Sequence, residues 1–72
     1  RDLGPQPLAQ LLERHGRRAA DLVTASKEQI THKMVTRGAK GRWLTTNVRG
    51  KLLRALNGAS GEAYTLRDLF SY

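Results

Sequence analysis

The chain has 72 residues, of which 39% are hydrophobic and 26% charged, the size and composition of a small globular protein with one core. It contains no cysteine, so disulfides, thiolate metal sites and cysteine nucleophiles are excluded. No apolar run approaches the roughly 20 residues of a membrane span. We therefore expect a single domain over residues 1–72 with its core at about 6–70, without cofactor, metal or membrane association.

The positive charge is concentrated in the middle of the chain. Thirteen Lys and Arg against six Asp and Glu give a formal net charge of +7. Residues 1–26 and 55–72 nearly cancel, whereas residues 27–54 hold eight basic side chains against Glu28 alone, a local +7. Concentrated like charge is relieved when a polyanion covers it, and nucleic acid is the commonest such partner. The alternative is a solvated basic face that aids solubility.

Three helices are predicted in the first half. The first lies at about 6–15, because prolines stand at its start, leucines recur at helical spacing and Gly16 can end it. The second runs from Arg18 to about Ala25. Ser26-Lys27-Glu28-Gln29 has the pattern of a capping box, which predicts that a third helix starts there. This third helix runs to Gly38, whose freedom at positive φ suits a helix end.

Two more helices follow a basic loop at about 39–44. Thr45 or Thr46 can cap the fourth, whose apolar stripe includes Leu52 and which Asn57-Gly58 ends. Thr65-Leu66-Arg67-Asp68 repeats the capping pattern and starts a short terminal helix. Nothing in the sequence has the alternating pattern of a strand pair. The predicted fold class is all-α, a compact bundle of about five short helices.

The third predicted helix has one face rich in hydrogen-bond donors and free of carboxylates. It carries Gln29, His32, Lys33, Thr36 and Lys40, opposite an apolar side. Such a helix suits the major groove of DNA, where Gln can bond adenine edges, Lys can reach guanine acceptors, and Thr or His can donate to either. The alternative is an ordinary solvated helix surface.

The sequence gives little indication of a metal site or of catalysis. The two histidines, His15 and His32, lie far apart in a chain without cysteine, which does not match a zinc site. The mid-chain carboxylates Asp21 and Glu28 have no recognisable spacing from a nucleophile, so we expect no enzyme. For Trp43 we favour a lid on the core, with a DNA contact or a dimer contact as alternatives.

The order of these elements resembles the helix-turn-helix domains of the Cro and phage-repressor (XRE) type, over roughly residues 8–70. The matching segments are Leu8 to Gly16, the short helix around Leu22-Val23, Ser26 to Ile30, the loop from Arg37 to Arg42, Val48 to Leu56, and Leu66 to Phe70. The family commonly has Gly-Val-Ser between its two motif helices. Thr24-Ala25-Ser26 stands there in this chain, which predicts a shortened turn.

The resemblance implies a set of DNA contacts for this chain. Facing base edges would be Lys27, Gln29, His32, Lys33 and Thr36. Holding phosphates would be Arg17, Arg18, Arg37, Lys40, Arg42, Thr45, Thr46 and Asn47.

The corresponding function is sequence-specific binding of double-stranded DNA, as a transcriptional regulator in the cytoplasm, associated with the nucleoid. The helix at about 27–38 would enter the major groove while the basic loop lies on the phosphates. We expect a homodimer, at least on DNA, because one such helix reads only a few base pairs. The dimer contact could involve Phe70 and Tyr72, or Tyr64. Two alternatives are an RNA-binding module and a protein-interaction domain of the antitoxin or adaptor type.

Overall fold

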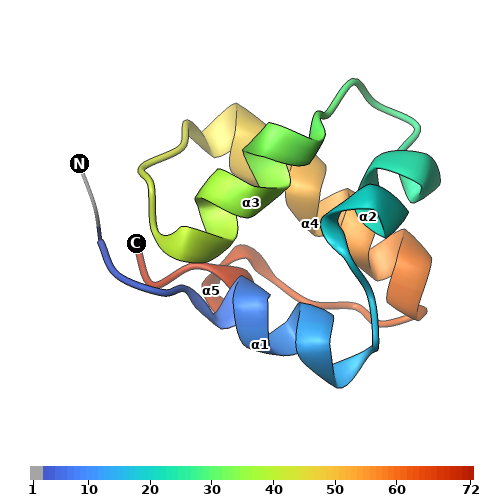
Figure 1. The fold of residues 1–72 in the computed structure, drawn as a ribbon, viewed down its shortest axis with the longest axis horizontal. Helices are drawn as coiled ribbons and strands as arrows, with labels where there is room; N and C mark the ends of the chain where they lie inside the picture. Colours follow the sequence, from blue (N-terminus) through green and yellow to red (C-terminus); the bar gives the residue numbers. More distant parts are fainter. Residues whose placement is uncertain (1–2) are drawn as a thin grey trace.

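The computed structural model describes residues 3–72, and over that range the chain forms five helices in an all-α bundle (Figure 1). The helices are α1 (Pro7–Arg14), α2 (Ala19–Ala25), α3 (His32–Lys40), α4 (Thr46–Ser60) and α5 (Leu66–Leu69). The predicted fold class is confirmed. Within the same range, no helix is both long and apolar enough to cross a bilayer.

The core lies where α4, the longest helix, packs against α2, α3 and α5, with α1 closing it from the side of α3 and α5. Leu52 and Leu56 of α4 are completely buried, as the predicted apolar stripe requires. Leu8 of α1 and Leu22 of α2 are equally inaccessible. Each element thus contributes its apolar side to one shared core and leaves its polar side to solvent.

The third helix begins later than predicted. The hydroxyl of Ser26 accepts the Glu28 amide at 3.0 Å and donates to the Glu28 carbonyl at 2.8 Å, so it closes a local turn and caps no helix. The N-cap is Thr31, whose hydroxyl accepts the Met34 amide at 3.1 Å. The capping-box prediction was wrong because a Ser hydroxyl can bond a nearby amide in a turn as readily as at a helix start. Residues 26–31 therefore form a long turn, and the predicted shortened turn is also wrong.

This helix also ends later than predicted, because Gly38 serves packing. A Cβ at Gly38 would lie 2.9 Å from Leu44 Cδ1 and 3.3 Å from Leu52 Cδ1, so a larger residue here would make these leucine side chains move. The helix continues to Lys40, and Gly41 takes the left-handed conformation at φ +101°. A Cβ at Gly41 would in addition overlap the Gly4 carbonyl.

The other helix ends follow ordinary capping rules. Gly16 after α1 has φ +61°, and the Asp68 carboxylate accepts the Thr65 amide at 2.8 Å before α5, both as predicted. The fourth helix runs through Asn57-Gly58 and ends at Ser60, before Gly61 at φ +74°. The prediction that Asn57-Gly58 ends this helix is therefore wrong. The side chain of Asn57 is engaged with the loop after α4, where its amide pairs with the N–H and the carbonyl of Tyr64 at 2.9 and 3.1 Å.

The segment before α1 fixes the end of α3. The Leu3 amide donates to the Gly41 carbonyl at 2.7 Å, and the Gln6 amide donates to the Ala39 carbonyl at 3.0 Å. The buried side chain of Gln6 then accepts the Ser71 amide at 2.7 Å and its hydroxyl at 2.9 Å. Residues 3–6 and the C-terminal segment consequently lie side by side next to the end of α3 (Figure 1).

Candidate nucleic-acid interface

The outward side of α3 gathers basic residues on one surface. Lys33, Thr36, Arg37 and Lys40 follow the i, i+3, i+4, i+7 spacing of one helix face, opposite the buried Val35. With two neighbours they border an open hollow of about 540 Å³. We call this set the α3 surface: His32, Lys33, Thr36, Arg37, Lys40 and Arg42.

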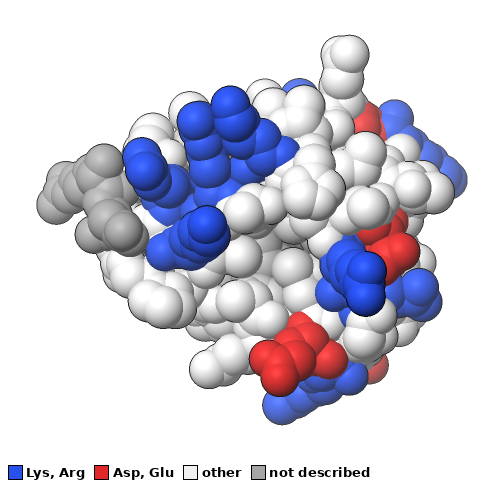
Figure 2. Space-filling view, in the orientation of Figure 1, with Lys and Arg blue, Asp and Glu red and all other residues white. Residues whose placement is uncertain are grey.

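The α3 surface carries uncompensated positive charge. Residues 32–42 include four basic side chains, all exposed, and no Asp or Glu. Over the part of the chain that the structure describes, the one ion pair joins Glu28 to Arg54, which lie outside this surface. Figure 2 shows the consequence: among the described residues, Lys and Arg side chains cluster over one side of the molecule without Asp or Glu between them, whereas basic and acidic side chains mix on the other side.

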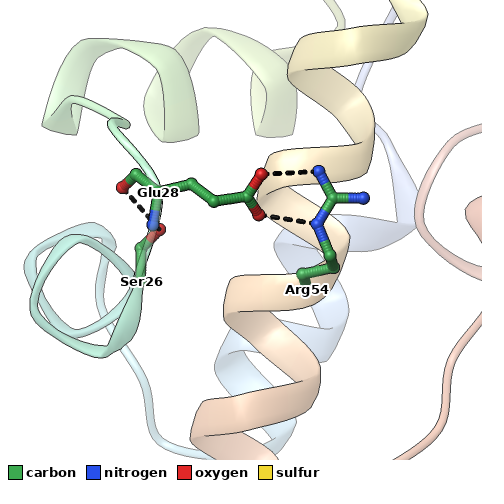
Figure 3. A network of polar contacts seen from close by, with 3 residues as sticks. All are labelled: Ser26, Glu28 and Arg54. Carbon is green, nitrogen blue, oxygen red and sulfur yellow. Dashed lines mark hydrogen bonds and ion pairs between the residues drawn. The ribbon is translucent and has the colours of Figure 1, made fainter.

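The Glu28–Arg54 pair holds the turn of residues 26–31 against α4 (Figure 3). The guanidinium of Arg54 donates from Nε and Nη2 to the two carboxylate oxygens of Glu28, at 2.6 and 2.7 Å. These hydrogen bonds lower the pKa of the Glu28 carboxyl, burial acts in the opposite direction, and the charges of Arg54 and Lys51 add to the lowering. The single acidic group of residues 27–54 is thereby engaged by α4 and leaves the charge of the α3 surface unopposed.

The loop after α3 is held by the C-terminal segment. The Tyr72 hydroxyl accepts the Leu44 amide at 3.0 Å and donates to the Arg42 carbonyl at 3.2 Å. Arg49 donates to the Tyr72 carbonyl at 2.7 Å, and its guanidinium carbon lies 4.6 Å from the centre of the Tyr72 ring. Sequence analysis missed this support because nothing in the local pattern around Tyr72 connects it to a loop 28 residues away.

Trp43 projects from this supported loop. It is 55% exposed, the one large hydrophobic side chain in residues 3–72 with high exposure, and it takes no part in the core. The prediction of a lid on the core is therefore wrong. The core is closed at this point by the half-buried Leu44, so the indole of Trp43 has no cavity to cover.

The structure separates the predicted base-reading residues into two groups. His32 and Lys33 are exposed in the first turn of α3, and Thr36 lies one turn further, half-buried, with its hydroxyl donating to the His32 carbonyl at 3.0 Å. Lys27 and Gln29 are exposed but lie in the turn before α3. Their placement on the helix face was wrong because the helix begins at His32.

The predicted phosphate-binding residues near α3 come together. Arg37, Lys40 and Arg42 belong to the α3 surface. The first turn of α4 borders the other side of α3, where a second hollow of about 310 Å³ includes Arg37 and Val48 in its lining. Three polar residues lie at this helix start: Thr45, which caps it by accepting the Val48 amide at 3.3 Å, Thr46, which accepts from Arg49 at 3.1 Å, and the exposed Asn47.

Arg17 lies at the other end of the molecule. Its guanidinium donates to the Ala59 carbonyl at 3.0 Å, at the C-terminal end of α4. This end is about 20 Å along the helix axis from Thr46. Arg18 is exposed immediately before α2, where its amide donates to the Asp21 carboxylate at 2.7 Å. The structure thus does not bring Arg17 together with the polar residues at the start of α4.

The aromatic residues suggested for a dimer contact are used inside the protomer. Phe70 is buried in the core, and Tyr72 supports the loop after α3. The Tyr64 hydroxyl lies 2.8 Å from Nε2 of His15, with the two rings edge to face. All three side chains thus have contacts within the protomer, and a role of the half-buried Tyr64 or Tyr72 in a dimer stays a prediction.

Comparison of the chain with protein-family models, with curated proteins and with solved structures found no match. Any function proposed for the chain therefore rests on the α3 surface itself. Residues 3–72 contain no group of three or more His, Asp or Glu side chains that could share a metal ion. The chemistry that this surface offers is attraction of anions and donation of hydrogen bonds.

Proposed function

We propose that the chain is a sequence-specific double-stranded DNA-binding protein that acts as a transcriptional regulator by placing α3 in the major groove. The observation that carries this proposal is the α3 surface, where four exposed cations, three on α3 and one just after it, lie with His32 and Thr36 and without an ion pair within residues 3–72. A phosphate-lined groove compensates this charge, and the polar side chains between the cations are of the kinds that read base edges.

The dimensions of α3 suit this role. The helix has nine residues, about 13 Å of axis, and the major groove is about 12 Å wide and admits an α-helix. Its N-terminal residues, His32 and Lys33, are placed as those of a recognition helix that contacts base edges. Lys40 and Arg42 lie at the other end, next to the loop that Tyr72 supports, and are placed to hold phosphates.

The start of α4 supplies a second anchor for the DNA backbone. The Val48 amide is bonded by the Thr45 hydroxyl, but the amides of Thr46 and Asn47 have no preceding helical carbonyl to pair with, and the helix dipole favours an anion there. Because Leu44 and Val48 border the same hollow as Lys33 and Arg37, this helix start lies beside α3. A phosphate held there would flank the groove that α3 enters.

A single α3 reads only a few base pairs. We propose that two copies bind half-sites about one helical turn apart, as a homodimer on DNA. The exposed Trp43 is the apolar side chain available for a contact with the second copy or with a deoxyribose.

The test is a competition among nucleic acids. A fluorescent duplex of random sequence is titrated with the protein and displaced by unlabelled duplex DNA, single-stranded DNA or hairpin RNA. We expect duplex DNA to compete best and salt to weaken binding. Preferential displacement by single strands or hairpin RNA would favour an RNA-binding module, with Trp43 stacking on bases. Absence of binding to all three would favour a protein partner and contradict the proposal.

The variant Lys33→Ala/Arg37→Ala tests whether the α3 surface is responsible. Both side chains are exposed and make no contact that the fold needs, so the variant is expected to remain folded. The matched control is Arg14→Ala/Arg67→Ala, which removes the same charge from exposed positions in α1 and α5. The first variant should bind DNA more weakly than the control. Equal losses would mean that net charge alone drives binding.

A further inference from the structure

The hydrogen-bonding groups of α3 are mostly donors. Lys33, Arg37 and Lys40 carry donors only, because ammonium and guanidinium groups have no acceptor. The hydroxyl of Thr36 donates to the His32 carbonyl at 3.0 Å, so this side chain keeps only the acceptor capacity of its oxygen. No Asn, Gln, Asp or Glu lies between His32 and Lys40. A helix of this kind can hydrogen-bond the acceptors on the major-groove edge of a DNA base, but it has few acceptors of its own for a base edge that presents a donor.

Guanine presents two acceptors in the major groove, N7 and O6, whereas thymine presents the single acceptor O4 beside its methyl group. Adenine pairs its N7 acceptor with an N6 donor, and cytosine presents an N4 donor, so both need an acceptor from the protein. Resting on the proposed function, we propose that α3 reads guanines in the major groove, with Lys33 and Arg37 donating to O6 and N7.

The spacing of the two side chains sets the spacing of the guanines. Lys33 and Arg37 are four residues apart on one helix face, which is about 6 Å along the axis. Consecutive base pairs are about 3.4 Å apart, so 6 Å covers about two steps. The preferred half-site therefore carries two guanines within three consecutive base pairs.

The placement of Gln29 separates this inference from the one that the sequence alone suggests. On a helix starting near Ser26, Gln29 would stand on the face that enters the groove and would favour adenine. The structure places Gln29 in the turn of residues 26–31, where the Glu28–Arg54 pair ties the chain to α4. The amide side chain is thereby removed from the helix, and the reading face is left to Lys33 and Arg37.

The experiment is selection of bound duplexes from a random pool, followed by sequencing and by substitution of 7-deazaguanine into the selected site. This base pairs normally but lacks the N7 acceptor. We expect enrichment of two guanines within three base pairs, and a loss of about fivefold in affinity for each guanine replaced, the lower end of the discrimination of a bidentate pair. The loss should disappear in Lys33→Ala or Arg37→Ala for the guanine that each residue contacts.

A second variant tests the assignment by changing specificity. Arg37→Gln introduces an amide that pairs with adenine, so selection with this variant should replace one guanine by adenine and keep the other. A selected motif without guanines, or one that is insensitive to 7-deazaguanine, would overturn the guanine assignment while leaving sequence-specific DNA binding intact. Duplex binding without any selected motif would overturn both proposals.

Discussion

The salt dependence of DNA binding should fall when Lys40 and Arg42 of the α3 surface are replaced by alanine. Four exposed cations on this surface, Lys33, Arg37, Lys40 and Arg42, lack an ion pair within residues 3–72. Lys40 and Arg42 are the two that we expect to hold phosphates, and each such contact adds about −0.9 to the slope of log K against log salt. Lys40→Ala/Arg42→Ala should therefore make this slope shallower by about 1.8. Raising the salt fourfold should then weaken binding by the original chain about 12-fold more than binding by the variant.

Fluorescence anisotropy of one labelled duplex at several salt concentrations measures both slopes. The double variant Arg14→Ala/Arg67→Ala provides the control, because it loses the same net charge at exposed positions outside the α3 surface. Its slope should stay near that of the original chain. Identical slopes for the two double variants would refute the reasoning, since binding would then respond to total charge and to no particular surface.

Three further predictions concern the fold that presents this surface, and thermal or urea unfolding followed by circular dichroism measures each. Leu52→Ala should lower the free energy of unfolding by roughly 2–5 kcal/mol because Leu52 is completely buried, and a loss no larger than that of the half-buried Leu53→Ala would contradict the core assignment. Gly41→Ala should cost roughly 1–3 kcal/mol because of the positive φ and the overlap with the Gly4 carbonyl. Gly58→Ala, inside α4 with open space around it, should instead stabilise by roughly 0.5–1 kcal/mol; a cost at Gly58 equal to that at Gly41 would refute this distinction. Glu28→Gln should lower the unfolding temperature at neutral pH, and the difference from the original chain should vanish as pH falls through the lowered pKa of the folded carboxyl, because only the ionised group gains from Arg54. A difference that persists unchanged in acid would show that the pair contributes nothing through its charge.

Local patterns predicted most of the helices. The first, second and terminal helices have their start and stop signals in their own sequence, such as Gly16 after α1 and Asp68 at the start of α5. The third helix was predicted to start at Ser26, whereas Thr31 caps it. The turn between these two residues is tied to α4 by the bond of Glu28 with Arg54, 26 residues away, and a local pattern does not contain that contact.

The α3 surface was predicted only in part for the same reason. Exposed basic residues on one helix face follow from periodicity alone, which places Lys33, Thr36 and Lys40 together in the structure as in the prediction. Gln29 was misplaced with the helix start, and the exposure of Trp43 depended on Leu44 filling the core beneath the loop. The support of the loop by Tyr72 arises from the meeting of distant segments.

The most direct test of the central claim is a titration of the ¹⁵N-labelled protein with a short duplex, followed amide by amide in NMR spectra. The account predicts that the shifts are largest for His32 to Arg42 and for the first turn of α4, and that the indole N–H of Trp43 responds with them. The amides of α1 near Arg14 should stay unchanged. Shifts centred on α1 or α5, with α3 unaffected, would contradict the claim that this surface is the one that meets DNA.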